Sequence, residues 1–302
     1  MDIVIFGAGA IGSLFGAYLS SNNNITLIGR SFHVNAINTG SLKIEGKTKF
    51  NKKVKSINSL DYVNKSPDLL LLTVKSYDTE IAIKQSLSII NNKTIILSFQ
   101  NGLDNINKIG KYVNKKQVIA GVTTHGSIFL KPGLIRHTGI GRTILGELDG
   151  RITKRIEKII KIFNKADIET QISQNIIREI WIKAIINSSI NPLTSIFQCK
   201  NGYLLKNPIL MNLVMNICKE STNIANIKGF KLSYNDMLRK TKEVIEKTYD
   251  NYSSMLQSIK KGKKTEIESI NGILIDIGKK FKIDTLLNNL LFNIICSITY
   301  DS

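Results

Sequence analysis

A glycine motif directly after the first apolar stretch most constrains what this chain can fold into. Asp2–Phe6 has the composition of a buried strand, and after the glycines come a helical pattern, Ser13–Ser20, and a second apolar stretch, Ile25–Ile28. In such a β-α-β unit the three glycines allow a tight turn, close approach of the backbone to a pyrophosphate, and packing of helix on strand. Free amides and the helix dipole then face the phosphates. The motif predicts a dinucleotide site made by Gly7, Ala8, Gly9, Ala10, Ile11 and Gly12.

Strand and helix signals alternate through the first half of the chain. Short runs rich in Ile, Val and Leu are typical of parallel strands that are covered on both faces. They are Asp2–Phe6, Ile25–Ile28, Asp68–Val74, Thr94–Phe99 and Gln117–Val122. Between Ser127 and Glu147 shorter β-like pieces broken by glycines are expected to extend the sheet. This alternation predicts an α/β fold with a doubly wound parallel sheet of Rossmann type.

The second half of the chain has mostly helical patterns. Examples are Asn207–Ile227, Tyr234–Lys260 and Ile267–Lys280. With 302 residues, of which 42% are hydrophobic, the chain is long enough for two domains with sizeable cores. We therefore expect a cofactor-binding domain at residues 1–173, followed by an all-helical domain at 174–302 that carries the substrate and catalytic residues.

The residue after the second strand indicates which dinucleotide binds. An Asp or Glu here would accept hydrogen bonds from the ribose 2′-hydroxyl of NAD. The chain has Gly29-Arg30-Ser31 instead. The planar guanidinium of Arg30 can hold a 2′-phosphate, which favours NADP(H) over NAD; the alternative is a solvated surface arginine.

Two further strands end in polar residues. Lys75 follows the strand ending at Val74, and Asn101 follows the strand ending at Phe99. Ligands of open α/β sheets bind beyond the carboxyl ends of the strands, so both residues belong to the predicted cofactor rim. The alternatives are a solvated loop charge for Lys75 and ordinary turn chemistry for Asn101 before Gly102.

The segment Trp181–Pro192 combines apolar residues with a polar stripe. Lys183, Asn187 and Asn191 follow one another at intervals of four. At 3.6 residues per turn, Lys183 and Asn187 share a face of a mostly apolar and hence buried helix, and a buried ammonium or amide needs a partner or a ligand. Pro192 disfavours α geometry at the preceding residue, which predicts that Asn191 lies at the helix end.

The chain resembles the ketopantoate reductases, the 2-dehydropantoate 2-reductases of pantothenate synthesis. The resemblance runs along essentially the whole chain. Besides the glycine motif, it is carried by Leu71–Lys75, Gln100–Gly102, Lys183 through Asn191-Pro192-Leu193-Thr194, Ser253–Gln257 and Thr265-Glu266-Ile267, and the last three together are specific to that family.

Several roles are implied by this resemblance. It makes Lys183 the catalytic acid and Glu266 the second catalytic group, which holds the lysine or the substrate. It places the substrate ketopantoate in an interdomain cleft against Asn187, Asn191 and Ser254. Asn101 and Lys75 would lie near the nicotinamide and its ribose, Asn101 also contacting substrate, and Arg30 would meet the 2′-phosphate.

The chemistry of these residue types agrees with ketone reduction. Hydride transfer to a ketone carbon leaves negative charge on oxygen, which a protonated amine can stabilise and then neutralise. Amides donate and accept, which suits a substrate with carboxylate, ketone and hydroxyl groups. The open alternatives are a structural ion pair between Lys183 and Glu266, a solvated Glu266, and amides that only bridge helices.

The charge and the cysteines point to no further ligand. A formal charge of +19 can mark a nucleic-acid or membrane partner, but 35 of the 42 basic residues are scattered lysines, and no long apolar run occurs. Met1–Phe6 lacks the basic flank and long apolar stretch of a signal peptide, so we expect none. Cys199, Cys218 and Cys296 lack metal-ligand spacing, so we expect free thiols and no metal. We expect His125 to be a satisfied loop or core residue, although it could line the cleft, and His33 and His137 to be ordinary residues without a role in the site.

The sequence thus predicts a cytoplasmic enzyme, monomer or homodimer, that reduces ketopantoate with NADPH. Two rivals stay open. One is a related enzyme for another 2-keto or 3-hydroxy acid, since a lysine four residues before an asparagine also occurs in 3-hydroxyacid dehydrogenases. The other is a non-enzymatic NADP-sensing or nucleic-acid-binding protein.

Overall fold

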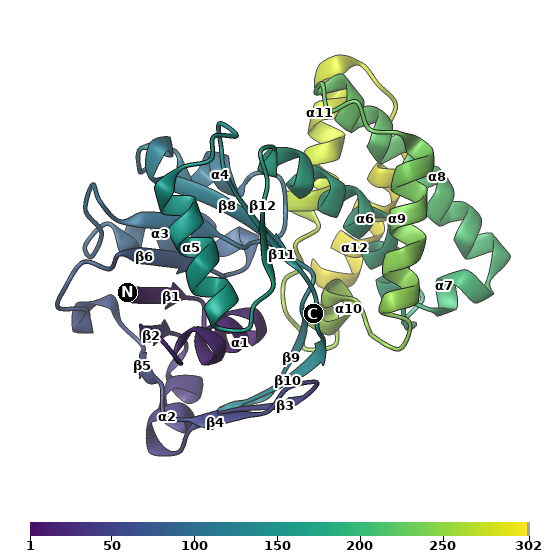
Figure 1. Ribbon diagram of the computed structural model, residues 1–302. Coiled ribbons are helices and arrows are strands. Elements are labelled where there is room, and N and C mark those ends of the chain that lie inside the picture. Colours follow the sequence, from purple (N-terminus) through teal and green to yellow (C-terminus); the bar gives the residue numbers. More distant parts are fainter. Residues whose placement is uncertain (301–302) are drawn as a thin grey trace. The chain divides into compact units, whose positions relative to one another are not determined.

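The computed structural model describes residues 1–300, which form two compact units (Figure 1). The first unit comprises Met1–Gln100 and Asn105–Glu179. The second, helical unit comprises residues 180–300 and the short loop Asn101–Asp104. The chain before and after this loop belongs to the first unit.

An eight-stranded sheet forms the centre of the first unit. Its strand order is β12-β11-β8-β7-β6-β1-β2-β5, and all neighbours are parallel except β8 and β11. The strands are β1 (Asp2–Phe6), β2 (Asn24–Ile28), β5 (Lys55–Ile57), β6 (Leu69–Leu72), β7 (Ile95–Ser98), β8 (Val118–Thr123), β11 (Thr143–Glu147) and β12 (Thr170–Ile172). Every residue of β6 is fully buried, as expected of a strand covered on both faces.

Helices cover both faces of this sheet. On one face Leu14 and Phe15 of α1 and Ile159 of α5 pack with the inward side chains of β1 and β7. On the other face Ile83 of α3 and Ile109 of α4 pack against alternate residues of the same strands. The helices of the first unit are α1 (Ala10–Leu19), α2 (Ser31–Thr39), α3 (Thr79–Ser86), α4 (Asn105–Ile109) and α5 (Lys154–Lys165), with 3₁₀ turns η1 (Leu60–Tyr62), η2 (Ser76–Asp78) and η3 (Lys115–Gln117). The predicted doubly wound α/β fold is confirmed.

A second sheet of four strands contacts α1 in the same unit. Its order is β4 (Phe50–Lys52), β3 (Leu42–Gly46), β10 (Leu134–Gly139) and β9 (Gly126–Lys131). The expected extension of the main sheet by residues 127–147 is therefore right for β11 and wrong for β9 and β10. The reason is that β10 pairs in parallel with β3, and their buried Ile135 and Ile44 join the core under α1.

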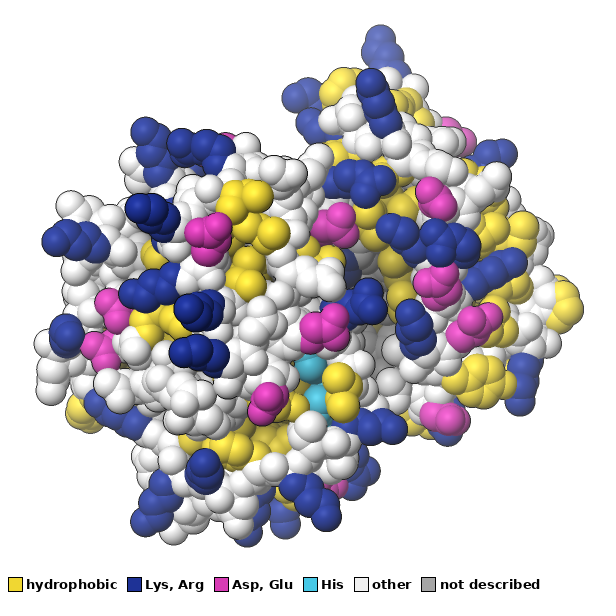
Figure 2. Space-filling model, viewed as in Figure 1, with side chains coloured by type: hydrophobic (Ala, Val, Ile, Leu, Met, Phe, Trp, Pro, Cys, Tyr) yellow, Lys and Arg dark blue, Asp and Glu magenta, His cyan; other side chains and the backbone are white. Residues whose placement is uncertain are grey.

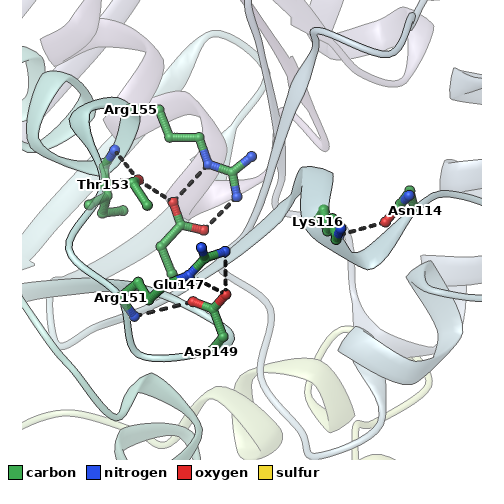
Figure 3. Close-up of polar contacts among 8 residues, drawn as sticks. Asn114, Lys116, Glu147, Asp149, Arg151, Thr153 and Arg155 are labelled. Atoms are coloured by element: carbon green, nitrogen blue, oxygen red, sulfur yellow. Dashed lines mark hydrogen bonds and ion pairs between the residues drawn. The ribbon is translucent and has the colours of Figure 1, made fainter.

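The start of α5 is tied to the end of β11 by a buried carboxylate (Figure 3). Glu147 is 5% exposed and accepts hydrogen bonds from Nε and Nη2 of Arg155 and from the hydroxyl of Thr153. Thr153 also caps the helix by accepting from the Ile156 N–H at 3.4 Å. Figure 3 shows the neighbouring surface pair, Asp149 and Arg151, beside it.

The regular elements in the described part of the second unit are all helices. Its elements are α6 (Ile176–Ile196), which begins in the first unit, α7 (Tyr203–Lys206), α8 (Pro208–Ile227), α9 (Tyr234–Lys247), α10 (Ser254–Ile259), a π-helix η4 (Glu268–Gly272), α11 (Ile273–Phe281) and α12 (Leu286–Tyr300). Side chains of α6, α8, α9 and α12 share one apolar core that includes Leu193, Val214, Ile245 and Leu291.

The helical pattern over Tyr234–Lys260 is interrupted in the structure. Residues 248–253 leave the helix, and the carbonyls of Tyr249 and Asn251 accept hydrogen bonds from the N–H groups of Gly202 and Asn201 at 2.9 and 3.0 Å. Ser253 then caps α10 by accepting from the Leu256 N–H. The tertiary hydrogen bonds thus compete with helical ones in this segment.

The expectation that Asn191 ends its helix is wrong. Helix α6 continues through Pro192 to Ile196. Leu193 beside the proline is fully buried, and the hydroxyls of Thr194 and Ser195 donate to the carbonyl oxygen of Asn191 at 3.0 and 2.7 Å. Burial of this segment and hydroxyl donors outweigh the local preference of a residue before proline.

Basic side chains are spread over the surface in Figure 2, without a single dominant patch on the face shown. Across residues 1–300 no helix combines the length and the apolar character needed to cross a membrane.

Candidate active site

The glycine motif forms a tight loop between β1 and α1. Gly7 has φ +112°, and its N–H and that of Ala8 both donate to the Ile28 carbonyl at the end of β2. A Cβ on Gly12 would lie 2.2 Å from the Gly7 oxygen. Gly9, by contrast, is exposed, and a Cβ there would meet only the Gly7 oxygen at 3.9 Å. The loop thus leaves open backbone at the N-terminus of α1, as pyrophosphate binding requires.

The predicted strand-end residues lie along the same edge of the sheet. β1, β2, β6 and β7 are neighbouring parallel strands, and Gly7, Arg30, Lys75 and Gln100 follow their carboxyl ends. The side-chain amide of Gln100 donates to the Val74 carbonyl and the Thr79 hydroxyl at 3.1 and 2.6 Å. This edge is where open α/β sheets bind their ligands.

Arg30 leaves its guanidinium available. Its backbone caps α2, and its carbonyl accepts from the N–H groups of His33 and Val34. Its side chain is exposed and makes no hydrogen bond within residues 1–300. Five N–H donors next to the glycine loop fit a phosphate on the cofactor ribose.

In the helical unit, two of the three residues of the polar stripe on α6 are partly exposed. Lys183 and Asn187 are half-buried, while their neighbours Ala184, Ile185 and Ser188 are fully buried. Asn191, two turns beyond Lys183, is 7% exposed. The geometry therefore keeps one ammonium and two amides in line on a mostly apolar helix.

Glu266 is held by the loop that follows β7. The Asn101 side-chain amide donates to Oε2 of Glu266 at 3.1 Å, and Glu266 is only 6% exposed. A buried carboxylate requires such donors. The structure thus brings together two predicted site residues that are 165 positions apart in sequence.

Ser254 is the first residue of α10, and its side chain is exposed. The preceding residue, Ser253, accepts a hydrogen bond at 2.8 Å from the hydroxyl of Thr194, one turn beyond Asn191 on α6. This link fixes the start of α10 to α6. Sequence reasoning assigned no role to Thr194 or Ser253, although both lie inside the family motifs.

The three histidines are buried and hydrogen-bonded, but Nε2 of His125 is buried without a hydrogen-bond partner among the described residues, so the prediction of satisfied histidines is wrong for this one nitrogen. His33 lies between the Ser13 hydroxyl and the Gly133 N–H, and His125 and His137 pair through their rings at 3.2 Å. Burial lowers the pKa of His33 to about 4. Burial, and then the neighbouring His137, lower the pKa of His125 to about 4. Within residues 1–300 no three His, Cys, Asp or Glu side chains come together as a metal site.

The fold and these residues define a class of protein: a Rossmann-type oxidoreductase with an additional helical unit. The family model of the ketopantoate reductase PanE/ApbA matches residues 3–150, and that of its C-terminal part matches residues 175–298. The 2-dehydropantoate 2-reductase of Pyrococcus abyssi is 41% identical over 298 residues, which cover 98% of this chain and 97% of that protein. This chain belongs to the ketopantoate reductase family, as the sequence motifs predicted.

Solved structures share the fold over the full chain. The crystal structure of a PanE/ApbA family ketopantoate reductase from Ralstonia eutropha is 27% identical, with a TM-score of 0.91, and covers 100% of this chain and 99% of its own. D-mandelate dehydrogenase, solved with NADH and anilino(oxo)acetate, is 26% identical, with a TM-score of 0.94 and the same coverage.

Proposed function

We propose that this protein reduces 2-dehydropantoate to (R)-pantoate with NADPH. The observation that carries this proposal is the 41% identity to a 2-dehydropantoate 2-reductase over 98% of the chain. The site supports it, because the first unit has a glycine loop and an exposed Arg30 at one sheet edge, and the helical unit has an ammonium, amides and a buried carboxylate.

Bound NADPH supplies the hydride. The residues Gly7, Ala8, Gly9, Ala10, Ile11 and Gly12 would hold its pyrophosphate, and Arg30 its 2′-phosphate. Lys75 and Asn101 would lie near the nicotinamide end, because each follows a strand at the same sheet edge.

Lys183 is the general acid in this proposal. Its ammonium stabilises the negative charge on the former ketone oxygen and gives it a proton. Glu266 favours the charged lysine and helps to fix the lysine or the substrate. Asn187, Asn191 and Ser254 donate to or accept from the carboxylate and hydroxyl groups of ketopantoate, and Asn101 contributes to the same set.

A second candidate is the reduction of another 2-keto acid. The fold similarity to D-mandelate dehydrogenase, whose complex contains NADH and anilino(oxo)acetate, favours it. Hydrophobic pockets that differ by a methylene discriminate between substrates by only about 1–3 kcal/mol, so close relatives of ketopantoate are the relevant competitors. Location in the cytoplasm and assembly as a monomer or homodimer stay predictions.

The test is oxidation of NADPH by the purified protein, followed at the nicotinamide absorbance band. Ketopantoate is compared with pyruvate and with an aryl 2-keto acid, each with NADPH and NADH. Rapid turnover of ketopantoate with NADPH, and little with NADH, is expected. Faster turnover of the aryl 2-keto acid would replace the first proposal with the second.

A further inference from the structure

The loop Asn101–Asp104 is bound to the π-helix that follows Glu266. The Leu103 N–H donates to the Ser269 carbonyl at 2.9 Å, and the Ser269 hydroxyl donates to Oδ2 of Asp104 at 3.2 Å. Ser269 is 3% exposed and lies within η4, three residues after Glu266. Ser269 therefore holds this loop through both its backbone carbonyl and its side-chain hydroxyl.

Gly102 allows the loop to approach Ser269 this closely. Its φ is +103°, and a Cβ at this position would lie 2.7 Å from Cβ and 2.9 Å from the carbonyl oxygen of Ser269. Any other residue would be strained in this conformation and would push the loop away from the π-helix. The loop is thus shaped to fit against Ser269.

The wide turn of η4 presents Ser269 to the loop. The Gly272 N–H donates to the Ile267 carbonyl, five residues earlier, at 3.0 Å. A π-helical turn accommodates one more residue than an α-turn and frequently occurs beside functional sites. Here it begins two residues after Glu266, so the segment that carries the carboxylate also carries Ser269, which holds the loop of its hydrogen-bond donor Asn101.

We propose that Ser269 is a positioning residue that, together with Asp104 and Gly102, fixes the Asn101 amide against the Glu266 carboxylate. This inference rests on the proposed function for its kinetic effect. Asn101 precedes Gly102 directly, and its amide reaches Glu266 at 3.1 Å. If the Asn101 amide is already fixed before the reaction, it does not have to be ordered in each turnover. This lowers the entropic cost of reaching the reactive geometry. Ser269 acts through Asn101 and touches no reacting atom.

The first test is a double-mutant cycle. Ser269→Ala should lower kcat for ketopantoate about fivefold, as expected for the loss of one hydrogen bond, and leave the KM for NADPH unchanged. In an Asn101→Ala background the same change should have no further effect on kcat, because its target is gone. The proposal is overturned if the fold-decreases in kcat of the two single variants multiply in the double variant, or if Ser269→Ala has wild-type kcat.

Conservative variants separate positioning from general destabilisation. Asp104→Asn keeps an oxygen acceptor for the Ser269 hydroxyl and should retain most of kcat, whereas Asp104→Ala should behave like Ser269→Ala. The matched control is Ser86→Ala, which removes a buried hydroxyl that donates to the Ala82 carbonyl of its own helix. The control should keep wild-type kcat.

A spectroscopic measurement distinguishes failure of this inference from failure of the proposed function. If wild-type protein does not reduce ketopantoate, the function is wrong, and positioning is then measured by the side-chain amide NMR signal of Asn101. That signal is assigned by its loss in Asn101→Ala. It should shift in Ser269→Ala and stay in place in Ser86→Ala; an unshifted signal in Ser269→Ala overturns the inference.

Discussion

The hydroxyl of Thr73, just beyond β6, donates a hydrogen bond at 2.8 Å to the carbonyl oxygen of Gly7, just beyond β1. This bond fixes the carbonyl that faces Gly12, where a Cβ would lie 2.2 Å from the Gly7 oxygen and 2.5 Å from Thr73 Oγ1. Gly7 and Gly12 are thus packed tightly within their own unit, whereas Gly9 is exposed.

The two glycines should therefore respond differently to alanine. Gly12→Ala forces backbone atoms apart and should lower the free energy of unfolding by about 1–3 kcal/mol or more, with loss of NADPH binding. Gly9→Ala has room within the protein and should leave unfolding nearly unchanged, yet weaken NADPH binding, because its methyl occupies the space of the pyrophosphate. Denaturant unfolding and NADPH fluorescence titration measure both. Unchanged NADPH affinity in Gly9→Ala would refute this assignment of the phosphate site.

Arg30 should determine the preference for NADPH. Replacing it with alanine removes charge-assisted hydrogen bonds worth about 1.5–3 kcal/mol, so the Kd for NADPH should rise roughly 10- to 150-fold while that for NADH stays constant. Arg30→Lys keeps the charge without the planar fork and should be intermediate. Equal weakening for both cofactors, measured by titration, would show that Arg30 does not contact the 2′-phosphate.

Lys183→Ala should cut kcat for ketopantoate about 10²- to 10⁴-fold if the ammonium is the general acid. Substitution of Lys219, an exposed lysine on α8, provides the control for general loss of positive charge and should have little effect. Stopped-flow measurement of NADPH oxidation gives the rate, and a parallel NADPH titration should show unchanged affinity. Full turnover in Lys183→Ala would remove the lysine from the mechanism.

Five strands of the main sheet could be predicted because their sequences are apolar runs, namely β1, β2, β6, β7 and β8. The edge strands β5 and β12 are three residues long with exposed polar positions, and they were not predicted. The second sheet could not be predicted, since β3 and its neighbour β4 are short and partly exposed, and the sheet is completed by pairing of β10 with β3 about ninety residues earlier. The continuation of helix α6 through Pro192 was missed for a related reason. Tertiary burial stabilises this part of the helix, and the local preference of a residue before proline does not include tertiary burial.

The site residues were predicted from two signals: residue types that are unusual for their surroundings, and, for Glu266 and Ser254, the family resemblance. An ammonium and amides on an apolar helix stand out in the sequence, as does an arginine in place of the expected carboxylate. Ser269 and Asp104 are ordinary polar residues 165 positions apart, so their pairing had no sequence signal. Only the folded chain shows that they meet beside Glu266.

The buried histidines should make stability depend on pH. His33 is 2% exposed, and burial lowers its pKa to about 4 from an ordinary value near 6.5. The unfolded state therefore binds a proton between these values that the folded state does not. Above pH 6.5 His33 is neutral in both states, and the free energy of unfolding has its full value. As the pH falls from 6.5 toward 4, only the unfolded state takes up the proton, so the free energy of unfolding decreases. His125, with its pKa also lowered to about 4, adds an effect of the same sign.

Denaturant unfolding at several pH values measures this effect. The free energy of unfolding should fall by up to about 3 kcal/mol per histidine between pH 6.5 and 4. His33→Gln should have a shallower dependence over this range, because one titrating group is gone. A slope that is the same in wild type and variant would show that His33 titrates alike in the folded and unfolded states.

Glu147 and Asp149 provide a comparison of a buried and an exposed ion pair two residues apart (Figure 3). Glu147→Ala leaves Arg155 and the Thr153 hydroxyl without their acceptor and loosens the start of α5. Breaking a buried pair costs about 3–5 kcal/mol, but the Arg155 side chain is 31% exposed and can be rehydrated, so about 2–3 kcal/mol is expected. Asp149→Ala removes a pair whose side chains are 53% and 72% exposed, and should change the free energy of unfolding by less than about 1 kcal/mol. Denaturant unfolding measures the change in the free energy of unfolding of each variant. Both are measured at the same salt concentration, because salt strongly screens only the exposed pair. Similar small losses in both would mean that Thr153 alone is enough to start α5.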